Sequence, residues 1–306
     1  MLSNYEQDYR RSLEHPELFW SEQAKAIDWF HSPERVMEED SNGVVRWFGG
    51  GKLNTAWLAL DRHVEAGRGD QIALIYDSPV TNTVARFTYR ELTERVAKVA
   101  GGLRGLNVVQ GDRVLIYMPM VPEAVIAMLA CARIGAVHSV VFGGFAAREL
   151  AMRIDDASPR VVLTASCGIE FQSVIAYKPL LDEAIGIAKH KPAACVVLQR
   201  ELLEAPLIAS RDHDWAEWEA RRNRVVGCIG RARSFVHSLH VGYDWQTQRR
   251  IAGSRRTCGR VELQYDRHLR NGCWGGLLGG FRCRLGGWAL LYRIWAPDQG
   301  LHDVAI

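Results

Sequence analysis

The sequence predicts an α/β protein in which a largely parallel sheet carries helices on both faces. Short runs rich in β-branched residues, such as residues 113–117 (RVLIY) and 138–142 (HSVVF), alternate with longer amphipathic stretches. That alternation is typical of βαβ units, whose parallel strands are buried on both faces. The length of 306 residues and the hydrophobic content of 48% leave room for two domains and exclude a fibrous or wholly disordered chain.

The predicted elements follow one another closely over the first 200 residues. Pro122 suits the first turn of a helix and Gly135 suits its end, so these residues bound one helix. His15 and Pro16 should interrupt the first helix. We expect helices at 5–27, 53–65, 90–106, 122–133, 146–155 and 180–190, and strands at 71–76, 85–89, 113–117, 138–142, 160–164 and 194–199.

The turn after the strand 138–142 is the candidate binding site. Ligands of open α/β sheets gather at the carboxyl ends of the strands. Phe142, Gly143 and Gly144 stand there, directly before a predicted helix. Two glycines would let a ligand approach the backbone, and the helix N-terminus would favour an anion. The alternative is a tight β–α turn that binds nothing.

Other residues of chemical interest have simpler interpretations. Asp155–Asp156 cannot share a helix face and is interpreted as solvated charge. Cys131 lies among apolar residues and should be a buried, inert thiol, whereas Cys167 is expected in a loop without a neighbouring histidine. His63 and His138 are interpreted as packing or surface residues. We therefore expect no catalytic residue and no metal ligand in the chain.

The charge distribution divides the chain. Residues 221–306 hold 15 Arg, no Lys and 5 acidic residues, so this tail carries +10 and the first 220 residues carry −7. An arginine-rich tail could bind nucleic acid. Its cysteines could suggest zinc, but they form no C-x-x-C pair. We expect neither a specific nucleic-acid partner nor a metal site, and the tail should be irregular or disordered because it lacks apolar periodicity.

The sequence gives no sign of a membrane or secreted protein. No apolar run reaches the roughly 18 residues of a membrane span, and residues 1–14 are polar and charged, without the apolar segment of a secretory signal. We therefore expect a cytoplasmic location and no membrane partner.

Five stretches resemble the acyl-CoA synthetases of the AMP-forming, adenylate-forming family, nearest to its propionyl-CoA and acetyl-CoA synthetases. The resemblance runs from about residue 5 to about residue 218. The stretches are 46–54 (RWFGGGKLN), 60–78 (LDRHVEAGRGDQIALIYDS), 87–92 (FTYREL), 111–157 (beginning GDRVLIYMPMVPEAV) and 177–185 (YKPLLDEAI).

The resemblance implies a ligase that uses ATP, Mg²⁺ and CoA to convert propionate or acetate into acyl-CoA through an acyl-adenylate. It also implies that Phe142, Gly143 and Gly144 border the CoA nucleotide. The family places a basic residue near the CoA phosphates at about Ser173, where this chain has none. The fold implied is the beginning of the large domain of the adenylate-forming enzymes.

The tail departs from the family in a way that codon degeneracy explains. Residues 240–251 read HVGYDWQTQRRI, and permissible codons for them, read one base later, give TSGTTGKPKGV. That sequence resembles the family's phosphate-binding loop, YTSGTTGKPKG. The same shift permits ARDPLYILY for residues 231–239 and a family-like continuation for 274–304. We infer one frameshift between about residues 218 and 231.

The resemblance and the shift predict three segments and no activity. Residues 1–64 should be the N-terminal segment of the acetyl-CoA synthetase type, 65–218 an incomplete AMP-binding domain, and 219–306 an out-of-frame tail. The chain would lack the ATP phosphate loop and the C-terminal domain, so it should bind no cofactor productively and should be aggregation-prone. The alternatives are a non-catalytic interaction module, or a sequencing error in an intact ligase.

Overall fold

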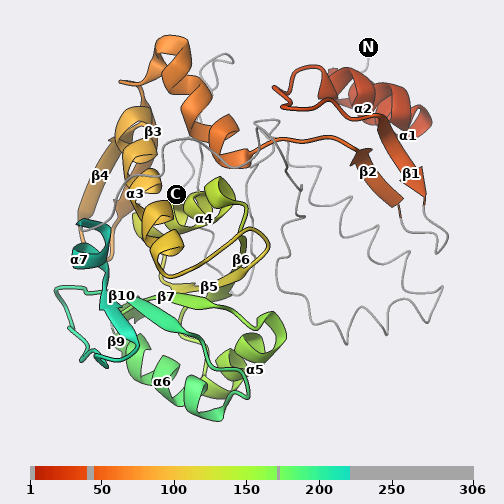
Figure 1. Cartoon of the computed structure of the whole chain (residues 1–306). Helices are drawn as coiled ribbons and strands as arrows, with labels where there is room; N and C mark the ends of the chain where they lie inside the picture. The colour runs from red at the N-terminus through yellow and green to blue at the C-terminus, as the bar shows by residue number, and fades with distance from the viewer. Residues whose placement is uncertain (1–3, 40–44, 171–172, 221–306) are drawn as a thin grey trace.

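The computed structural model describes residues 4–39, 45–170 and 173–220. Its centre is a five-stranded sheet in the order β11–β10–β7–β5–β6, and every adjacent pair of strands is parallel. Figure 1 shows β10, β7, β5 and β6 side by side across the body. The predicted α/β class and parallel sheet are confirmed. The strands are β5 (Arg113–Met118), β6 (Val137–Phe142), β7 (Val161–Ala165), β10 (Ala194–Leu198) and β11 (Asp212–Asp214).

Helices cover both faces of this sheet, as the alternating pattern predicted. Three of them pack on one face and two on the other, so each face has its own apolar core. The first face carries α3 (Tyr89–Gly105), α4 (Pro122–Ile134) and α7 (Trp215–Ala220), and the second carries α5 (Ala147–Ala157) and α6 (Tyr177–Ile187).

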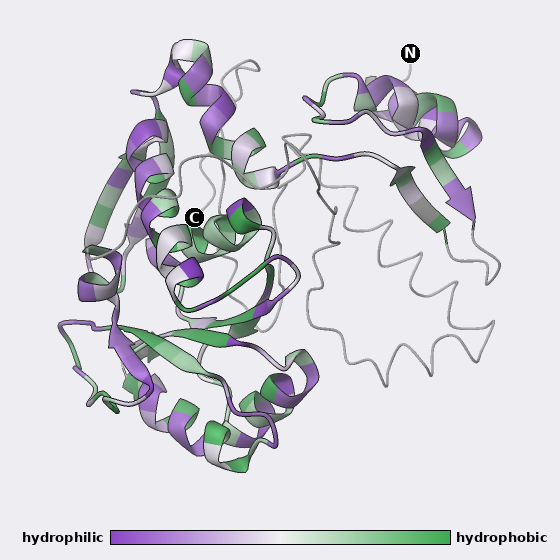
Figure 2. Cartoon of the chain, viewed as in Figure 1, coloured by the Kyte–Doolittle hydropathy of each residue, from purple (hydrophilic) through white to green (hydrophobic). Residues whose placement is uncertain are grey.

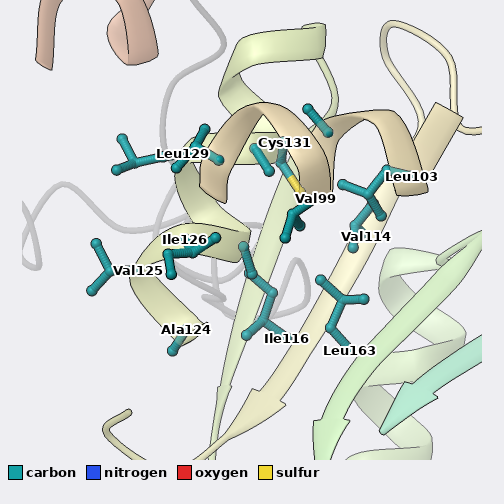
Figure 3. Close-up of a cluster of buried hydrophobic side chains, with 14 of the residues drawn as sticks. Val99, Leu103, Val114, Ile116, Ala124, Val125, Ile126, Leu129, Cys131 and Leu163 are labelled. Carbon is teal, nitrogen blue, oxygen red and sulfur yellow. The ribbon is translucent and has the colours of Figure 1, made fainter. Parts of the chain in front are cut away.

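Alternation along the strands divides the side chains between the two cores. On β5, Val114 and Ile116 join the α3/α4 core, whereas Leu115 and Tyr117 join the α5/α6 core. Figure 3 shows Ile116 beneath the side chains of α4 and close to Leu163 of β7. In Figure 2 the strands of this sheet are mainly hydrophobic and the polar residues gather on the outer helix faces. The sheet is therefore buried on both sides.

The ends of two helices follow from local sequence. Thr88 caps α3 in a capping box, accepting from the Glu91 amide at 3.2 Å while the Glu91 carboxylate accepts from the Thr88 amide at 2.8 Å. Pro122 begins α4, and Gly135 ends it with φ of 72°, which a residue with a side chain adopts poorly. Both predicted bounds of α4 are confirmed.

The N-terminal residues form a separate small unit. It comprises α1 (Asn4–Glu14), α2 (Pro16–Ala24) and an antiparallel pair, β1 (Arg35–Glu39) and β2 (Val45–Gly49). The predicted interruption at His15 and Pro16 is confirmed. Aromatic rings join the helices to the hairpin, since Trp20 lies 6.0 Å from Trp47 between ring centroids. The hairpin was not predicted, because its five-residue strands show no regular alternation.

The helix expected at 53–65 exists but is wound more loosely. It contains two π-helical stretches, η1 (Trp57–Asp61) and η2 (Val64–Arg68). Asn54 joins this helix to α4: its side-chain oxygen accepts from the Ala56 amide at 3.0 Å, and its amide nitrogen donates to the Ala132 carbonyl at 3.0 Å. Arg133, which is 3% exposed, pairs with Asp61 through two bonds of 2.8 Å.

Three other features differ from the sequence-based expectation. The predicted strands 71–76 and 85–89 form an isolated antiparallel hairpin, β3 (Ile72–Ser78) and β4 (Thr83–Thr88), outside the parallel sheet. Cys167, expected in a loop, begins β8 (Cys167–Glu170), which pairs with β9 (Ser173–Ala176). β8, β9, β11 and α7 were not predicted, because each is at most six residues long and too short to show a period.

The inferred frameshift (between about residues 218 and 231), the expected irregular tail (219–306) and the phosphate-loop region lie almost entirely beyond residue 220, outside the described residues, although residues 219 and 220 still belong to α7. Within the described ranges, no helix is long and apolar enough to span a membrane.

Candidate functional site

The carboxyl end of the parallel sheet brings four connecting segments together. These segments follow Met118, Phe142, Ala165 and Leu198, the last residues of β5, β6, β7 and β10. The helices after β5 and β7, α4 and α6, cover opposite faces of the sheet. Adjacent parallel strands whose connections diverge in this way define the position where open α/β sheets bind ligands.

The Gly143–Gly144 turn leads from β6 into α5 at this end of the sheet. Gly144 has φ of +86°, in the left-handed region that favours glycine. A Cβ at Gly143 would lie 2.3 Å from the Tyr177 hydroxyl oxygen, and a Cβ at Gly168 would lie 2.2 Å from the same atom. The Tyr177 hydroxyl therefore occupies the space that both glycines leave open.

Two tyrosines support the turn from below. Tyr177 packs on Tyr117 of β5 with ring centroids 5.0 Å apart, and the Tyr117 hydroxyl donates to the Phe145 carbonyl at 3.2 Å. This packing gives Gly143 a structural reason that the sequence did not reveal. Tyr177 fills the space beside Gly143. The glycine at position 143 is therefore not by itself evidence that a ligand approaches the backbone there.

The N-terminus of α5 follows the turn. Its N-cap, Ala146, makes no side-chain capping bond, so no side chain occupies the first amides from that position. Arg148 is exposed in the first turn and would attract an anion, whereas Glu149 beside it would oppose one. An anion placed over the turn would therefore meet free amides and one guanidinium of this 11-residue helix.

Arg200 is a basic residue of this edge that sequence reasoning missed. Its guanidinium donates to the Cys167 carbonyl at 3.2 Å, and its backbone amide donates to the Ser166 hydroxyl at 2.9 Å. Cys167 precedes Gly168, which packs on Tyr177. Ser173, where a basic residue was expected, lies exposed on β9. Arg200 directly follows a predicted strand, and this position could have identified it from the sequence as a residue of the ligand-binding edge.

A closed group of four charges lies where α6 meets the start of β11. Lys178 is 1% exposed, and its ammonium donates to Asp182 at 2.6 Å and to Asp212 at 2.8 Å. Arg211 pairs with both carboxylates, at 2.7 Å from Asp212. Burial by itself would raise the pKa of Asp212, but the hydrogen bonds from Arg211 and Lys178 outweigh it and hold the pKa below its ordinary value. Each charge here has a partner of opposite sign.

The remaining singled-out residues are structural. Burial raises the pKa of the Cys131 thiol to about 12, which makes it unreactive as expected. Cys167 is fully buried. The Asp155 carboxylate accepts from the His190 amide at 2.8 Å, although it was interpreted as solvated. His63 is buried against Tyr89, with ring centroids 4.5 Å apart. Within the described residues, no group of His, Cys, Asp and Glu could hold a metal ion.

Comparison with known proteins defines the class of this chain. Residues 60–232 match the AMP-binding enzyme family, and residues 5–59 match the acetyl-coenzyme A synthetase N-terminus family. The first match alone covers more than half of the 306 residues, so the chain belongs to the AMP-binding enzyme family. The resemblance read from the sequence is confirmed.

The similar proteins include an acyl-CoA synthetase and a propionate–CoA ligase. The chain is 49% identical over 220 residues to human acyl-CoA synthetase short-chain family member 3, mitochondrial, and 44% identical over 213 residues to propionate–CoA ligase of Escherichia coli. An uncharacterized Pseudomonas aeruginosa protein, PA3568, is 57% identical over 213 residues. These matches cover 72%, 70% and 70% of this chain, but 32%, 34% and 34% of the relatives.

A solved structure shares the fold. Acetoacetyl-CoA synthetase from Streptomyces lividans superposes with a TM-score of 0.64 and 28% sequence identity, over 74% of this chain and 34% of that chain. The chain therefore spans about a third of the length of the proteins it matches.

Proposed function

We propose that this chain is the N-terminal part of a short-chain acyl-CoA synthetase and that, as translated, it does not catalyse the ligase reaction. The parent reaction would convert propionate or acetate, ATP and CoA into acyl-CoA, AMP and diphosphate, with Mg²⁺ accompanying the nucleotide. The observation that carries the proposal is the shifted reading of residues 240–251, which restores a phosphate-binding loop that the translated residues lack.

The lost loop explains the proposed inactivity. A phosphate loop of this kind holds ATP through backbone amides, hydroxyls and a lysine. Residues 242–245 read Gly-Tyr-Asp-Trp instead, which brings two bulky rings and one negative charge. A carboxylate repels nucleotide phosphates, and no lysine follows Lys191 in the chain. The division into segments 1–64, 65–218 and 219–306 remains part of this proposal.

The first experiment is to sequence the genomic DNA across codons 160–260 on both strands. A dropped or added base relative to the recorded sequence would mean that the native protein is an intact ligase. A confirmed shift would identify the chain as a remnant. A frame-corrected gene should then yield acyl-CoA from ATP, propionate and CoA, while the chain as written stays at the level of a heat-killed control. Turnover by the unaltered chain would overturn the proposal.

We further propose that the CoA nucleotide of the parent enzyme lies over Phe142, Gly143 and Gly144. The support is the uncapped N-terminus of α5 beside the turn, together with Arg148 and Arg200 at the same edge. In the frame-corrected enzyme, Arg148→Ala and Arg200→Ala should raise the KM for CoA more than the KM for ATP. Arg104→Ala, an exposed substitution on α3, is the matched control. Unchanged KM values for CoA in both variants would remove the turn as the nucleotide site.

The partners proposed for the parent enzyme are small molecules: a short carboxylate, ATP and CoA. The name of the human relative assigns that protein to the mitochondrion. The cytoplasmic location expected from this sequence therefore stays a prediction, and cell fractionation is its test. The expected aggregation of the chain and the expected lack of a specific nucleic-acid partner also stay predictions.

A further inference from the structure

The two edges of the parallel sheet differ in length and in charge. The β11 edge has only three residues, Asp212, His213 and Asp214, and so short an edge strand discourages pairing with another strand. The β6 edge has six residues, Val137–Phe142 (VHSVVF), with no acidic residue, lysine, arginine or proline. Within the described ranges, no strand pairs with the outer side of β6.

The direction of the backbone groups of β6 follows from one hydrogen bond. The Val137 amide donates to the Asp112 carbonyl at 2.8 Å, on the side where β5 lies. Successive residues of a strand turn their amide and carbonyl groups to opposite sides. Ser139 and Val141 therefore face β5, whereas His138, Val140 and Phe142 direct their backbone amides and carbonyls away from the sheet.

The middle of this edge is exposed to solvent. Val140, at the middle of the outward-facing set, is 48% exposed. Near it, the His138 Nε2 atom is buried and has no hydrogen-bond partner in the described structure. An uncharged edge with an exposed apolar centre is a template for pairing with another chain.

We propose that β6 pairs antiparallel with β6 of a second copy of this chain, about a two-fold axis at Val140. In this register Val140 faces Val140 of the second copy, and His138 faces residue 142. Each facing pair exchanges two backbone hydrogen bonds, because the outward residues form the hydrogen-bonded pairs of an antiparallel ladder. The result is a ten-stranded sheet across the dimer, with one antiparallel junction at its centre.

Self-complementarity selects a second copy as the occupant. A two-fold interface requires a surface that matches itself, and β6 presents no charge that would face its own equivalent. The β11 edge is a weaker candidate, since it has only three residues to pair with a second copy. This inference does not depend on the proposed enzymatic function, because it uses only the shape and chemistry of one strand.

Sedimentation of the full 306-residue chain tests the pairing. The wild type should show a concentration-dependent mass that reaches twice the monomer. Val140→Lys should be monomeric at the same concentrations, because lysine on an edge strand opposes pairing. Val84→Lys is the matched control, since Val84 is a 54% exposed valine on β4, and it should dimerise like the wild type. Unfolding curves should show both variants folded.

A cysteine cross-link keeps the test decisive if Val140→Lys fails to fold. Val140→Cys, with the cysteines at 228, 258, 273 and 283 changed to serine, should oxidise to a disulfide-linked dimer. Facing residues in a hydrogen-bonded antiparallel pair have Cα atoms about 5.5 Å apart, which a disulfide can span. Val84→Cys in the same background should stay largely monomeric.

Three results would overturn the proposal. One is a monomeric wild type at every concentration. Another is equal cross-linking of Val140→Cys and Val84→Cys, which would mean non-specific aggregation. The third is exchange protection of the Val140 amide in a monomer, which would mean that residues 221–306 of the same chain cover the edge.

Discussion

The two faces of the central sheet are stabilised by different means. On the α3/α4 face the buried residues are almost all aliphatic, and Leu103, Ile116 and Ile126 have no exposed surface. The α5/α6 face also has an apolar core, but it adds the Tyr117–Tyr177 pair and the four charges around Lys178. The candidate turn, Gly143–Gly144, lies against the tyrosines of this second face. The first face is stabilised mainly by aliphatic packing, although the Arg133–Asp61 ion pair lies at its α4 side, whereas the second adds the tyrosine pair that supports the turn.

Removal of Lys178 should have the largest effect. Lys178→Met would leave Asp212 buried without one of its two cations, and breaking a buried ion pair costs about 3–5 kcal/mol. Urea unfolding at pH 7 would measure the loss. Arg90→Met is the control, because Arg90 and Asp70 are largely exposed and their pair should contribute less than about 1 kcal/mol. Equal losses in the two variants would contradict the importance assigned to the buried charges.

The same site predicts an acid response. The folded pKa of Asp212 is depressed, so its contribution is present above the ordinary carboxylate range and is lost as the pH falls through the folded value. The penalty of Lys178→Met should therefore diminish as the pH falls below about 4.

A truncation on the opposite face should cost about as much without any dependence on pH. Leu103→Ala removes a fully buried side chain of α3, and such changes cost about 2–5 kcal/mol through lost transfer energy and a residual cavity. The measurement is the urea midpoint between pH 4 and pH 8. A loss that varied strongly over this range would show that the packing of Leu103 is coupled to a titrating group.

His138 on β6 is a buried titratable residue of the central sheet, so stability should depend on pH outside the Lys178 group as well. Burial lowers its pKa to about 4, so the folded protein binds this proton less readily than the unfolded chain does. Above pH 7 the histidine is neutral in both states and does not change the free energy of unfolding. As the pH falls from about 6.5 to about 4, this free energy should decrease by roughly 2–3 kcal/mol. His138→Gln should remove that pH-dependent part. An unchanged pH profile in the variant would assign acid sensitivity to other groups.

A methyl group at Gly143 should have the smallest effect of the four. Gly143→Ala places a Cβ 2.3 Å from the Tyr177 hydroxyl oxygen, so the turn or the ring must shift, at about 1–3 kcal/mol. The double variant with Tyr177→Leu should lose less than the sum of the single losses, because each substitution relieves the other. Additive losses would mean that Tyr177 does not restrict Gly143.

The sequence predicted the sheet because its longer strands are apolar runs rich in β-branched residues, and it predicted α3 to α6 because these helices are long enough to show a period. β5, β6, β7 and β10, with α3 to α6, were all expected near their observed positions. The hairpins β1–β2 and β8–β9 were missed because their strands of four or five residues form neither a continuous β-branched run nor a regular alternation. The family resemblance rested on long continuous stretches of sequence, and the family matches over residues 5–59 and 60–232 confirm it.

The candidate site was only partly visible in the sequence. The Gly143–Gly144 turn could be located because it directly follows a predicted strand. Its contacts could not, since Tyr177, which fills the space beside both Gly143 and Gly168, reaches the turn from a distant position in the chain. Arg200 and the Lys178 group depend on the same long-range arrangement, which a single sequence does not encode in any local pattern.

The close packing of Trp218 on Gly102 has a consequence for how the protein folds during synthesis. A Cβ at Gly102 would lie 2.3 Å from the Trp218 ring, so α3 has a hollow shaped for a side chain that follows 116 positions later. Strand β5, α4 and β6 are contiguous and can associate as they leave the ribosome. The space beside Gly102 on α3 can be filled only after α7 has been synthesised. Until then we expect the apolar surface of α3 to be accessible to chaperones. Ribosome-bound chains halted with residue 200 exposed should bind a chaperone holdase more strongly than chains with residue 220 exposed, and equal binding would contradict this order of assembly.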